Sequence, residues 1–256
     1  MTEFVLSIDT RKFSSTNALW NDLMLNDPLS VGYVSTLIAL QQFATKEDWE
    51  QFYYKTGAER EALLANLDLE SQGILRDERM IRTNKAKVLK LSQDHSNINT
   101  QHGRTIEELR KKGEILYENL NPKGRLTKDE CFECVRYRVI CETWNGIIIR
   151  ERNTIEAMKK KCVGVEFRSV SGEVDYTYAV DYEVYKKNKL ICGIQIKPKS
   201  YTWNAPYIQS AKRANEKKNA SYTEQFKVPV ITIISDTKGT ILNAEALNTL
   251  LRVVSV

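Results

Sequence analysis

The pattern of apolar residues changes near residue 162, and this change limits the possible folds. Before it, apolar positions follow a helical spacing, as at Val34, Leu37 and Ile38. After it, residues 163–170, 175–185 and 190–197 are rich in β-branched and aromatic side chains, which is typical of strands. A helical stretch at 204–218 then precedes VPVITIIS at 228–235, an apolar run expected of a strand buried on both faces. The order predicts an α/β or α+β fold.

The first 120 residues predict a mostly helical region. Helices are expected over residues 16–25, 30–42, 46–55 and 58–67, with Gly57 between the last two. Thr105 with Glu108, and Thr127 with Glu130, form capping boxes that mark two further helix starts. The polar stretch 92–103 predicts a loop or an exposed segment. The segment that begins with Asn121 marks a boundary between a helical lobe, residues 1–121, and a second domain, residues 122–256.

Composition restricts the class of protein. Hydrophobic residues make up 42% and charged residues 28% of the chain, as in ordinary folded domains. No apolar run approaches the ~18 residues of a membrane span, so we expect a cytoplasmic protein without membrane association. The sequence lacks a GxxxxGK[ST] loop, so no nucleotide cofactor is expected. The net charge of +5 suits a polyanionic partner but is also common among proteins that have none.

The five cysteines predict buried thiols in a reducing compartment. Cys131, Cys134 and Cys141 are three and seven residues apart, so on a helix they form one stripe. Structural zinc sites instead bring pairs of ligands together from turns, and a second pair is missing.

The segment 179–201, AVDYEVYKKNKLICGIQIKPKSY, carries the candidate chemistry. It places Asp181 in one expected strand, and Gln195 with Lys197 at the end of the next. Side chains two apart on a strand share a face, so Gln195 and Lys197 point the same way. A hairpin loop with an odd number of residues, centred on Asn188, sets Asp181 opposite Gln195 on one face of the sheet. A loop with an even number of residues would put Asp181 and the Gln195–Lys197 pair on opposite faces.

These side chains suit the hydrolysis of a phosphodiester. The reaction needs a divalent ion near the phosphate and a positive group near the attacking water. Asp181, the amide oxygen of Gln195 and the main-chain carbonyl of Ile196 provide oxygen ligands for Mg²⁺, which keeps several waters. Lys197 would orient the nucleophile or help to deprotonate it. The alternative is an exposed hairpin with ordinary surface charges.

The arrangement resembles the PD-(D/E)xK nuclease superfamily, especially type II restriction endonucleases, over about residues 130–235. Within that group it resembles the MjaI type, in the phrases RVICETWNG and GIQIKPKSY. The resemblance implies a nuclease core with a mixed sheet flanked by helices, a helical glutamate, Glu142 or Glu133, and a double-stranded DNA substrate.

The chain departs from the superfamily pattern at two positions. Val180 stands at the motif's proline, and Gln195 replaces its usual acid. The second change removes a charge that Glu183 or Glu142 would restore.

The resemblance leads to a site-specific endonuclease, expected as a homodimer that cuts both strands. We expect the helical lobe to contribute DNA recognition or dimerisation, with basic contacts to DNA from Arg76, Arg79, Arg82, Lys85, Lys87 and Arg104. In the second domain, Lys199 and Tyr201 are expected to contact DNA as well. Two alternatives stay open. One is a repair or recombination nuclease of the same superfamily, and the other is a basic DNA-binding protein without enzymatic activity.

Overall fold

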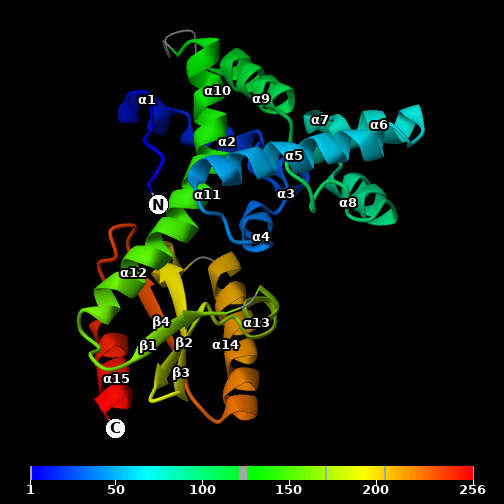
Figure 1. The fold of residues 1–256 in the computed structure, drawn as a ribbon. Coiled ribbons are helices and arrows are strands. Elements are labelled where there is room, and N and C mark those ends of the chain that lie inside the picture. Colours follow the sequence, from blue (N-terminus) through cyan, green and yellow to red (C-terminus); the bar gives the residue numbers. More distant parts are fainter. Residues whose placement is uncertain (1, 121–125, 171, 205, 256) are drawn as a thin grey trace. The chain divides into compact units, whose positions relative to one another are not determined.

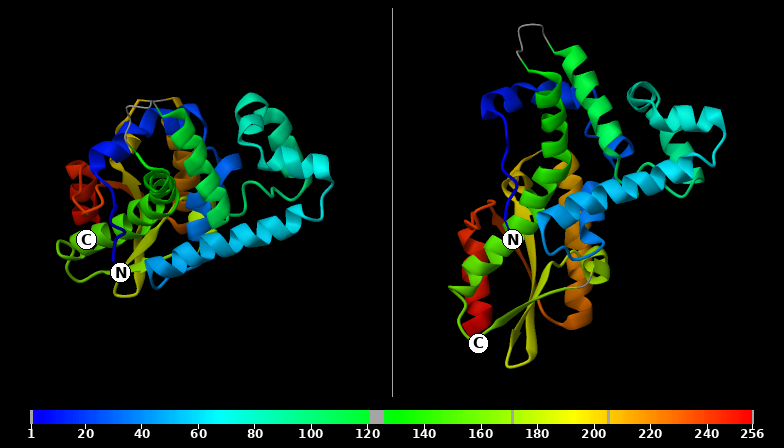
Figure 2. Two further views of the ribbon diagram at one scale, coloured as in Figure 1. Left: turned by 90° about the horizontal axis from the view of Figure 1, so that it is seen from above. Right: turned by 45° about the horizontal axis from the view of Figure 1, so that its top comes forward.

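The computed structural model describes residues 2–120, 126–170, 172–204 and 206–255. The chain divides into two compact units, Met1–Trp144 and Asn145–Val256 (Figure 1). The expected boundary at Asn121 lies outside the described residues. The division follows Trp144 because Lys128–Arg136 (α10) packs along Ile106–Asn119 (α9), side by side with it in both views of Figure 2. This helix pair keeps residues 126–144 with the N-terminal unit.

The N-terminal unit is helical, as the sequence predicts. Besides α9 and α10, its elements are α1 (Thr10–Ser15), α2 (Asn17–Asp22), α3 (Pro28–Val31), α4 (Val34–Ala39), α5 (Lys46–Leu64), α6 (Leu69–Arg76), α7 (Glu78–Thr83), α8 (Lys85–Asp94), the π-helical η2 (Tyr137–Cys141) and α11 (Glu142–Trp144). Both predicted capping boxes are confirmed. Thr105 and Glu108 cap α9, and Thr127 and Glu130 cap α10.

The structure differs from the sequence analysis in two features of this unit. Helix α5 runs without a break through Gly57, where two helices were expected. A Cβ at Gly57 would lie 2.3 Å from the carbonyl carbon of Arg104, so the glycine serves a close approach between segments and does not end the helix. Residues 95–103 form turns and irregular structure, which agrees with the predicted loop, but the stretch is not exposed throughout, because Ile98, Asn99 and Thr100 are buried. Both differences arise from tertiary packing.

The C-terminal unit is a four-stranded sheet between helices. Its elements are η3 (Asn145–Ile149), α12 (Arg150–Lys159), β1 (Glu166–Ser169), α13 (Gly172–Tyr178), β2 (Tyr182–Lys186), β3 (Lys189–Pro198), η4 (Lys199–Thr202), α14 (Pro206–Phe226), β4 (Val230–Ser235) and α15 (Ala244–Ser255). The strand order is β1-β2-β3-β4, with β1, β2 and β3 antiparallel and β3 parallel to β4. Helix α14 supplies the crossover that a parallel pair needs. The expected mixed sheet flanked by helices is confirmed.

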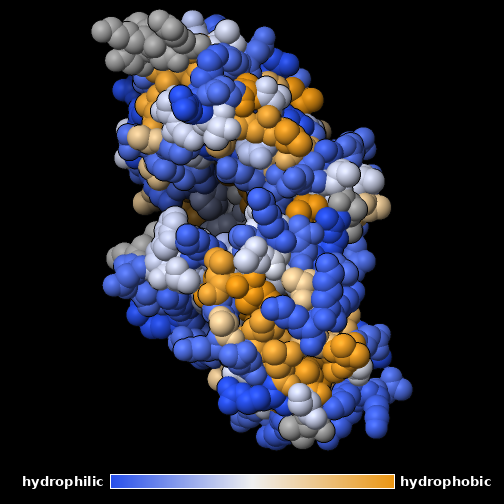
Figure 3. All heavy atoms as spheres, turned by 90° about the vertical axis from the view of Figure 1, so that its left-hand side faces the viewer, coloured by the Kyte–Doolittle hydropathy of each residue, from blue (hydrophilic) through white to orange (hydrophobic). Residues whose placement is uncertain are grey.

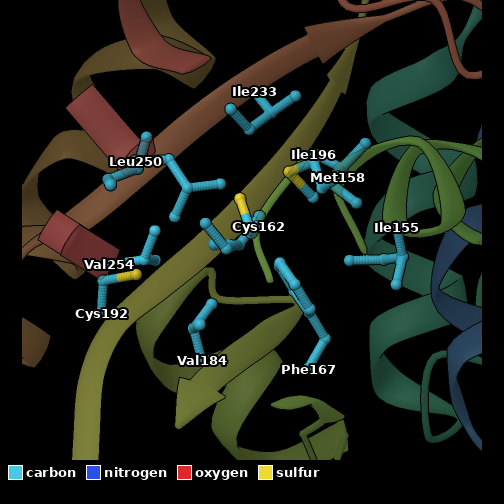
Figure 4. Close-up of a cluster of buried hydrophobic side chains, with 12 residues drawn as sticks. Ile155, Met158, Cys162, Phe167, Val184, Cys192, Ile196, Ile233, Leu250 and Val254 are labelled. Carbon is cyan, nitrogen blue, oxygen red and sulfur yellow. The ribbon is translucent and has the colours of Figure 1, made fainter. Parts of the chain in front are cut away.

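The two faces of the sheet differ in chemistry. One face is covered by α12 and α15, and Figure 4 shows its apolar core, which includes Met158, Val184, Ile196 and Leu250. The other face carries α14 (Figure 1). On that face the hydroxyl of Tyr222 donates to Glu183 at 2.7 Å. The polar face is therefore the one that contains candidate functional groups.

Residues 175–178 form the end of helix α13, so the prediction of a strand there is wrong. Ala179 follows with φ of 54°, a left-handed conformation that reverses the chain before β2 begins. Asp181 consequently lies just before β2, whereas the sequence placed it within a strand.

The prediction of buried thiols is confirmed, because all five cysteines are unpaired and buried. Hydrophilic residues cover much of the face of each unit shown in Figure 3, with apolar areas between them. Among the helices of the described chain, none combines the length and apolarity required to cross a bilayer.

Candidate active site

The hairpin of β2 and β3 sets the register of the site. Tyr182 pairs with Ile194, which places Asp181 at the level of Gln195, as the sequence favoured. The tip differs from the prediction. Lys186 pairs with Lys189 across a two-residue turn whose residues both have positive φ, a type that matches strand twist. The register then shifts by one residue between the tip and Val184. This bulge restores the position of Asp181 at the level of Gln195, which a two-residue turn alone would not give.

Asp181 is attached to β3 on both sides of Gln195. Its main-chain N–H donates to the Ile194 carbonyl at 2.8 Å, and its Oδ2 accepts the N–H of Ile196 at 2.5 Å. The N–H and C=O of one strand residue point to the same neighbour. The Ile196 carbonyl therefore faces the side on which Asp181 lies, which suits the ligand role predicted for it.

Gln195 is fully buried on the α14 side of the sheet. Its Oε1 accepts from the Thr232 hydroxyl at 3.2 Å and from the Asn219 amide at 3.4 Å. Its Nε2 has no partner within the described part of the chain. Lys197, two residues further along β3, shares this face and is partly buried. A buried amide with one unused polar atom is costly unless that atom meets a ligand.

Several charges meet at Asp181. Burial raises the pKa of Asp181 to about 6, with Lys197 acting against the rise and Asp175 adding to it. Burial also raises the pKa of Glu151, in the first turn of α12, and repulsion from Asp181 raises it further. The pKa of Asp175 is raised by burial and lowered by Lys197. Three carboxylates and one lysine therefore share one environment, and such perturbation is typical of functional sites.

Comparison with known proteins agrees with this geometry. A family model described as MjaI restriction endonuclease matches residues 16–243. The chain belongs to the MjaI restriction endonuclease family. The resemblance found in the sequence is confirmed, and membership implies a nuclease that acts on DNA. Neither the curated proteins nor the solved structures contain a significant match to the chain.

In this MjaI-family protein, the helical carboxylate beside Asp181 is Glu151. Sequence reasoning missed it and named Glu142 or Glu133. Glu142 lies on α11 in the N-terminal unit, where Arg138 is the charge that acts on its pKa. Glu133 forms an ion pair with Arg136 at 3.2 Å. The segment that carries Glu151 was predicted as a basic amphipathic helix, and an acid in its first turn was the one available signal.

Two other side chains complete the surroundings. Glu183, expected to restore the missing charge, accepts the hydroxyls of Tyr222 and Tyr185, each at 2.7 Å. Arg150 is 9% exposed, and its Nε has no partner in the part of the chain that the structure describes. Burial lowers its pKa, while the negative charges of Glu151 and Asp181 oppose the shift. Arg150 thus balances part of the negative charge of the site.

The predicted DNA contact of Arg104 is wrong. This side chain is 2% exposed, and its guanidinium donates to the carbonyls of Leu29, Asn99, His102 and Gly103 at 2.7 to 2.9 Å. Its donors hold the 92–103 segment in place and do not reach solvent. An arginine near polar residues looks the same in sequence whether it binds main chain or phosphate.

The other predicted DNA-binding residues of the MjaI-family chain differ in their surroundings. Arg76 pairs with Glu61 at 2.5 Å, Lys85 pairs with Asp27, and Lys87 lies 3.7 Å from Glu70. Arg79 and Arg82 are exposed and line a cavity of about 550 Å³ that also contains acids. Lys199 is exposed and Tyr201 half-buried, and both follow β3 directly on η4. Their contacts with DNA stay predictions.

The site fits a metal ion that takes few protein ligands. Among the described residues, no three His, Cys, Asp or Glu side chains are arranged to hold a metal. The candidate oxygen ligands are instead the Asp181 carboxylate, the Ile196 carbonyl and the amide of Gln195, a buried side chain with one polar atom that has no partner among the described residues. Hard divalent ions such as Mg²⁺ bind oxygen ligands and keep several waters, so this donor set suits Mg²⁺ better than zinc.

Proposed function

We propose that this MjaI-family protein is a type II restriction endonuclease, which makes Mg²⁺-dependent, sequence-specific double-strand breaks in DNA by phosphodiester hydrolysis. The observation that carries the proposal is the attachment of Asp181 to β3 around Gln195, with Lys197 on the same face as Gln195. Acid, amide and lysine come together on two adjacent strands. This order of groups also supports assignment to the PD-(D/E)xK superfamily.

Each residue has a distinct role in the proposed reaction. Asp181, Gln195 and the Ile196 carbonyl would hold Mg²⁺, which when bound stabilises negative charge on the phosphate and makes the attacking water more acidic. Lys197, whose positive charge acts on Asp181, orients that water and helps its deprotonation by stabilising the hydroxide electrostatically. Glu151 and Arg150 adjust the charge around Asp181.

The pKa values give the site a pH requirement. Burial raises the pKa of Asp181 to about 6, so its carboxylate is the main form at neutral pH and is lost under mildly acidic conditions. Activity is therefore expected to rise through about pH 6.

Incubation of plasmid DNA with the purified protein and Mg²⁺ tests the proposal. Discrete fragments are expected from the wild type and none from Asp181→Ala, while DNA binding by the variant persists because its basic surface is unchanged. Binding by that variant can increase, since removal of a carboxylate near phosphate lessens repulsion. Smears or structure-dependent nicks would instead indicate a repair nuclease, and intact plasmid would indicate a DNA-binding protein without activity.

We also propose that the enzyme acts as a homodimer, in which two copies of the site cut the two strands. Sedimentation of the protein alone and with a DNA duplex measures this directly. A complex of one chain per duplex that still cuts both strands would contradict it.

A further inference from the structure

The structure places Asn219 of α14 between the two segments that carry the candidate metal ligands. Its amide lies 3.4 Å from the amide of Gln195 on β3. With the amide turned by 180°, its nitrogen lies 2.8 Å from the Tyr178 carbonyl and 3.2 Å from the Ala179 carbonyl. Those carbonyls lie in the segment before Asp181, separated from it by Val180. One side chain therefore contacts both the Gln195 strand and the approach to Asp181.

Hydrogen bonding decides between the two orientations of Asn219. An amide has one donor end and one acceptor end of nearly equal size, so its partners determine which way it faces. The Tyr178 and Ala179 carbonyls can only accept hydrogen bonds. The Asn219 side chain therefore turns its nitrogen, which donates, toward both carbonyls. Its oxygen then faces Gln195.

The orientation of Asn219 in turn fixes that of Gln195. The end of the Gln195 amide that faces the Asn219 oxygen must be its nitrogen. This nitrogen then has two acceptors, Asn219 at 3.4 Å and the Thr232 hydroxyl at 3.2 Å. A hydroxyl accepts as readily as it donates. In this orientation the amide oxygen of Gln195 occupies the buried position where its nitrogen would have no partner. With both amides turned, each amide nitrogen has two acceptors: the Tyr178 and Ala179 carbonyls for Asn219, and the Asn219 oxygen and the Thr232 hydroxyl for Gln195.

The amide oxygen of Gln195 then becomes available to a cation. Thr232 pairs with Gln195 from β4, so the opposite end of the amide is turned away from β4. Asp181 lies on that other side of β3, between Ile194 and Ile196. A buried oxygen without a hydrogen-bond partner is a ligand that suits Mg²⁺, whereas an NH₂ group there would repel the ion.

Hydrogen bonds, and not side-chain packing, determine the orientation of the Gln195 amide. Gln195, Asn219 and Thr232 line a cavity of about 460 Å³, together with Tyr201 and Lys212. The two orientations of the fully buried Gln195 amide have nearly the same shape, so side-chain packing does not select one of them. The carbonyls of Tyr178 and Ala179 do so through Asn219.

We propose that Asn219 is a positioning residue that turns the amide oxygen of Gln195 toward the metal. This inference rests on the proposed function, since it assigns a role to a residue around the same site. Asn219 acts through Gln195 and does not bind the ion. Partners of this kind commonly change metal affinity by about 10- to 100-fold when they are removed.

The test is the binding of Mn²⁺, as a spectroscopic substitute for Mg²⁺, measured by electron paramagnetic resonance with and without a DNA duplex. We expect Asn219→Ala to weaken Mn²⁺ binding by about tenfold or more, because alanine removes the acceptor that the Gln195 nitrogen faces. Ser221→Ala is the matched control, because Ser221 is exposed on the same helix and donates only to the Lys217 carbonyl, at 3.2 Å.

A double-mutant cycle separates positioning from a general effect on folding. In a Gln195→Ala background, Asn219→Ala should cause no further loss of Mn²⁺ affinity, because the group it orients is absent. Unchanged affinity in Asn219→Ala, or independent losses that add, would overturn the inference. Mn²⁺ binding by a wild type that does not cleave DNA would contradict the proposed function and leave this inference standing. A wild type that binds no Mn²⁺ would contradict both.

Discussion

Asp181 forms hydrogen bonds with both chain neighbours of Gln195. Its N–H donates to the Ile194 carbonyl, and its carboxylate accepts the N–H of Ile196. This attachment holds an acid in a partly buried position beside other acids. The arrangement is favourable for binding a cation and unfavourable for the folded chain without one.

The first prediction concerns stability. The pKa of Asp181 rises on folding from its ordinary value near 4 to about 6, so the folded state holds more protons than the unfolded state between these values. Stability therefore falls as pH rises through this window, and the ionised carboxylate is destabilising above it. Without metal, Asp181→Asn should raise the melting temperature at about pH 7.5 and have little effect at about pH 4.

The charges that face Asp181 make this a test of the site as a whole. Glu151 and Asp175 repel its carboxylate, whereas Lys197 and Arg150 attract it. Calorimetric melts at the two pH values suffice. A lower melting temperature for Asp181→Asn at pH 7.5 would mean that the attractions outweigh burial.

The second prediction is that Lys197→Ala lowers the rate of DNA cleavage by about 10²- to 10⁴-fold, the usual contribution of a positioned proton-transfer group. Binding to uncleaved DNA should change little, because Lys197 is partly buried beside Asp181 and not on the outer surface. Single-turnover rates and equilibrium binding separate the two quantities. An equal loss in both would assign Lys197 to phosphate binding alone.

Replacement of the neutral ligand gives the third prediction. Gln195→Glu restores a second carboxylate, so the variant should keep some activity and reach half-maximal cleavage at a lower Mg²⁺ concentration. A Mg²⁺ titration of cleavage measures the shift. Complete inactivity of a folded variant would mean that the amide has another role, such as a hydrogen bond to DNA.

The fourth prediction separates a structural arginine from exposed ones in the N-terminal unit. Arg104→Ala removes four hydrogen bonds to main-chain carbonyls, so we expect the free energy of unfolding to fall by about 3 kcal/mol or more. Chemical denaturation measures the loss. Full stability of this variant would contradict the role assigned to the buried guanidinium.

Arg82→Ala is the matched control, because Arg82 is exposed. This variant should keep its stability, and if Arg82 contacts phosphate its DNA binding weakens for all sequences while the salt dependence of binding drops by about one unit.

Much of the local structure could be predicted from the sequence. Capping boxes depend on neighbouring residues, so Thr105 with Glu108 and Thr127 with Glu130 identified their helices. The position of Asp181 opposite Gln195 was also predicted, but the prediction did not include the bulge that produces it. The two-residue tip alone gives the wrong register, and the bulge that corrects it has no clear sequence signal.

The remaining features depend on contacts between distant segments. Gly57 and Arg104 touch across the N-terminal unit, and this contact explains both a helix that continues through glycine and an arginine that is not exposed. Glu151 joins Asp181 only because α12 packs on the sheet. A spacing pattern therefore located the strands of the site, while its helical acid required the structure.

Sequencing the ends of DNA fragments after digestion tests the central claim most directly. The purified protein with Mg²⁺ should produce ends at a fixed position relative to one short sequence, and Asp181→Ala or a chelator should abolish them. Ends distributed without regard to sequence, or the same ends from Asp181→Ala, would contradict a site-specific endonuclease built around Asp181, Gln195 and Lys197.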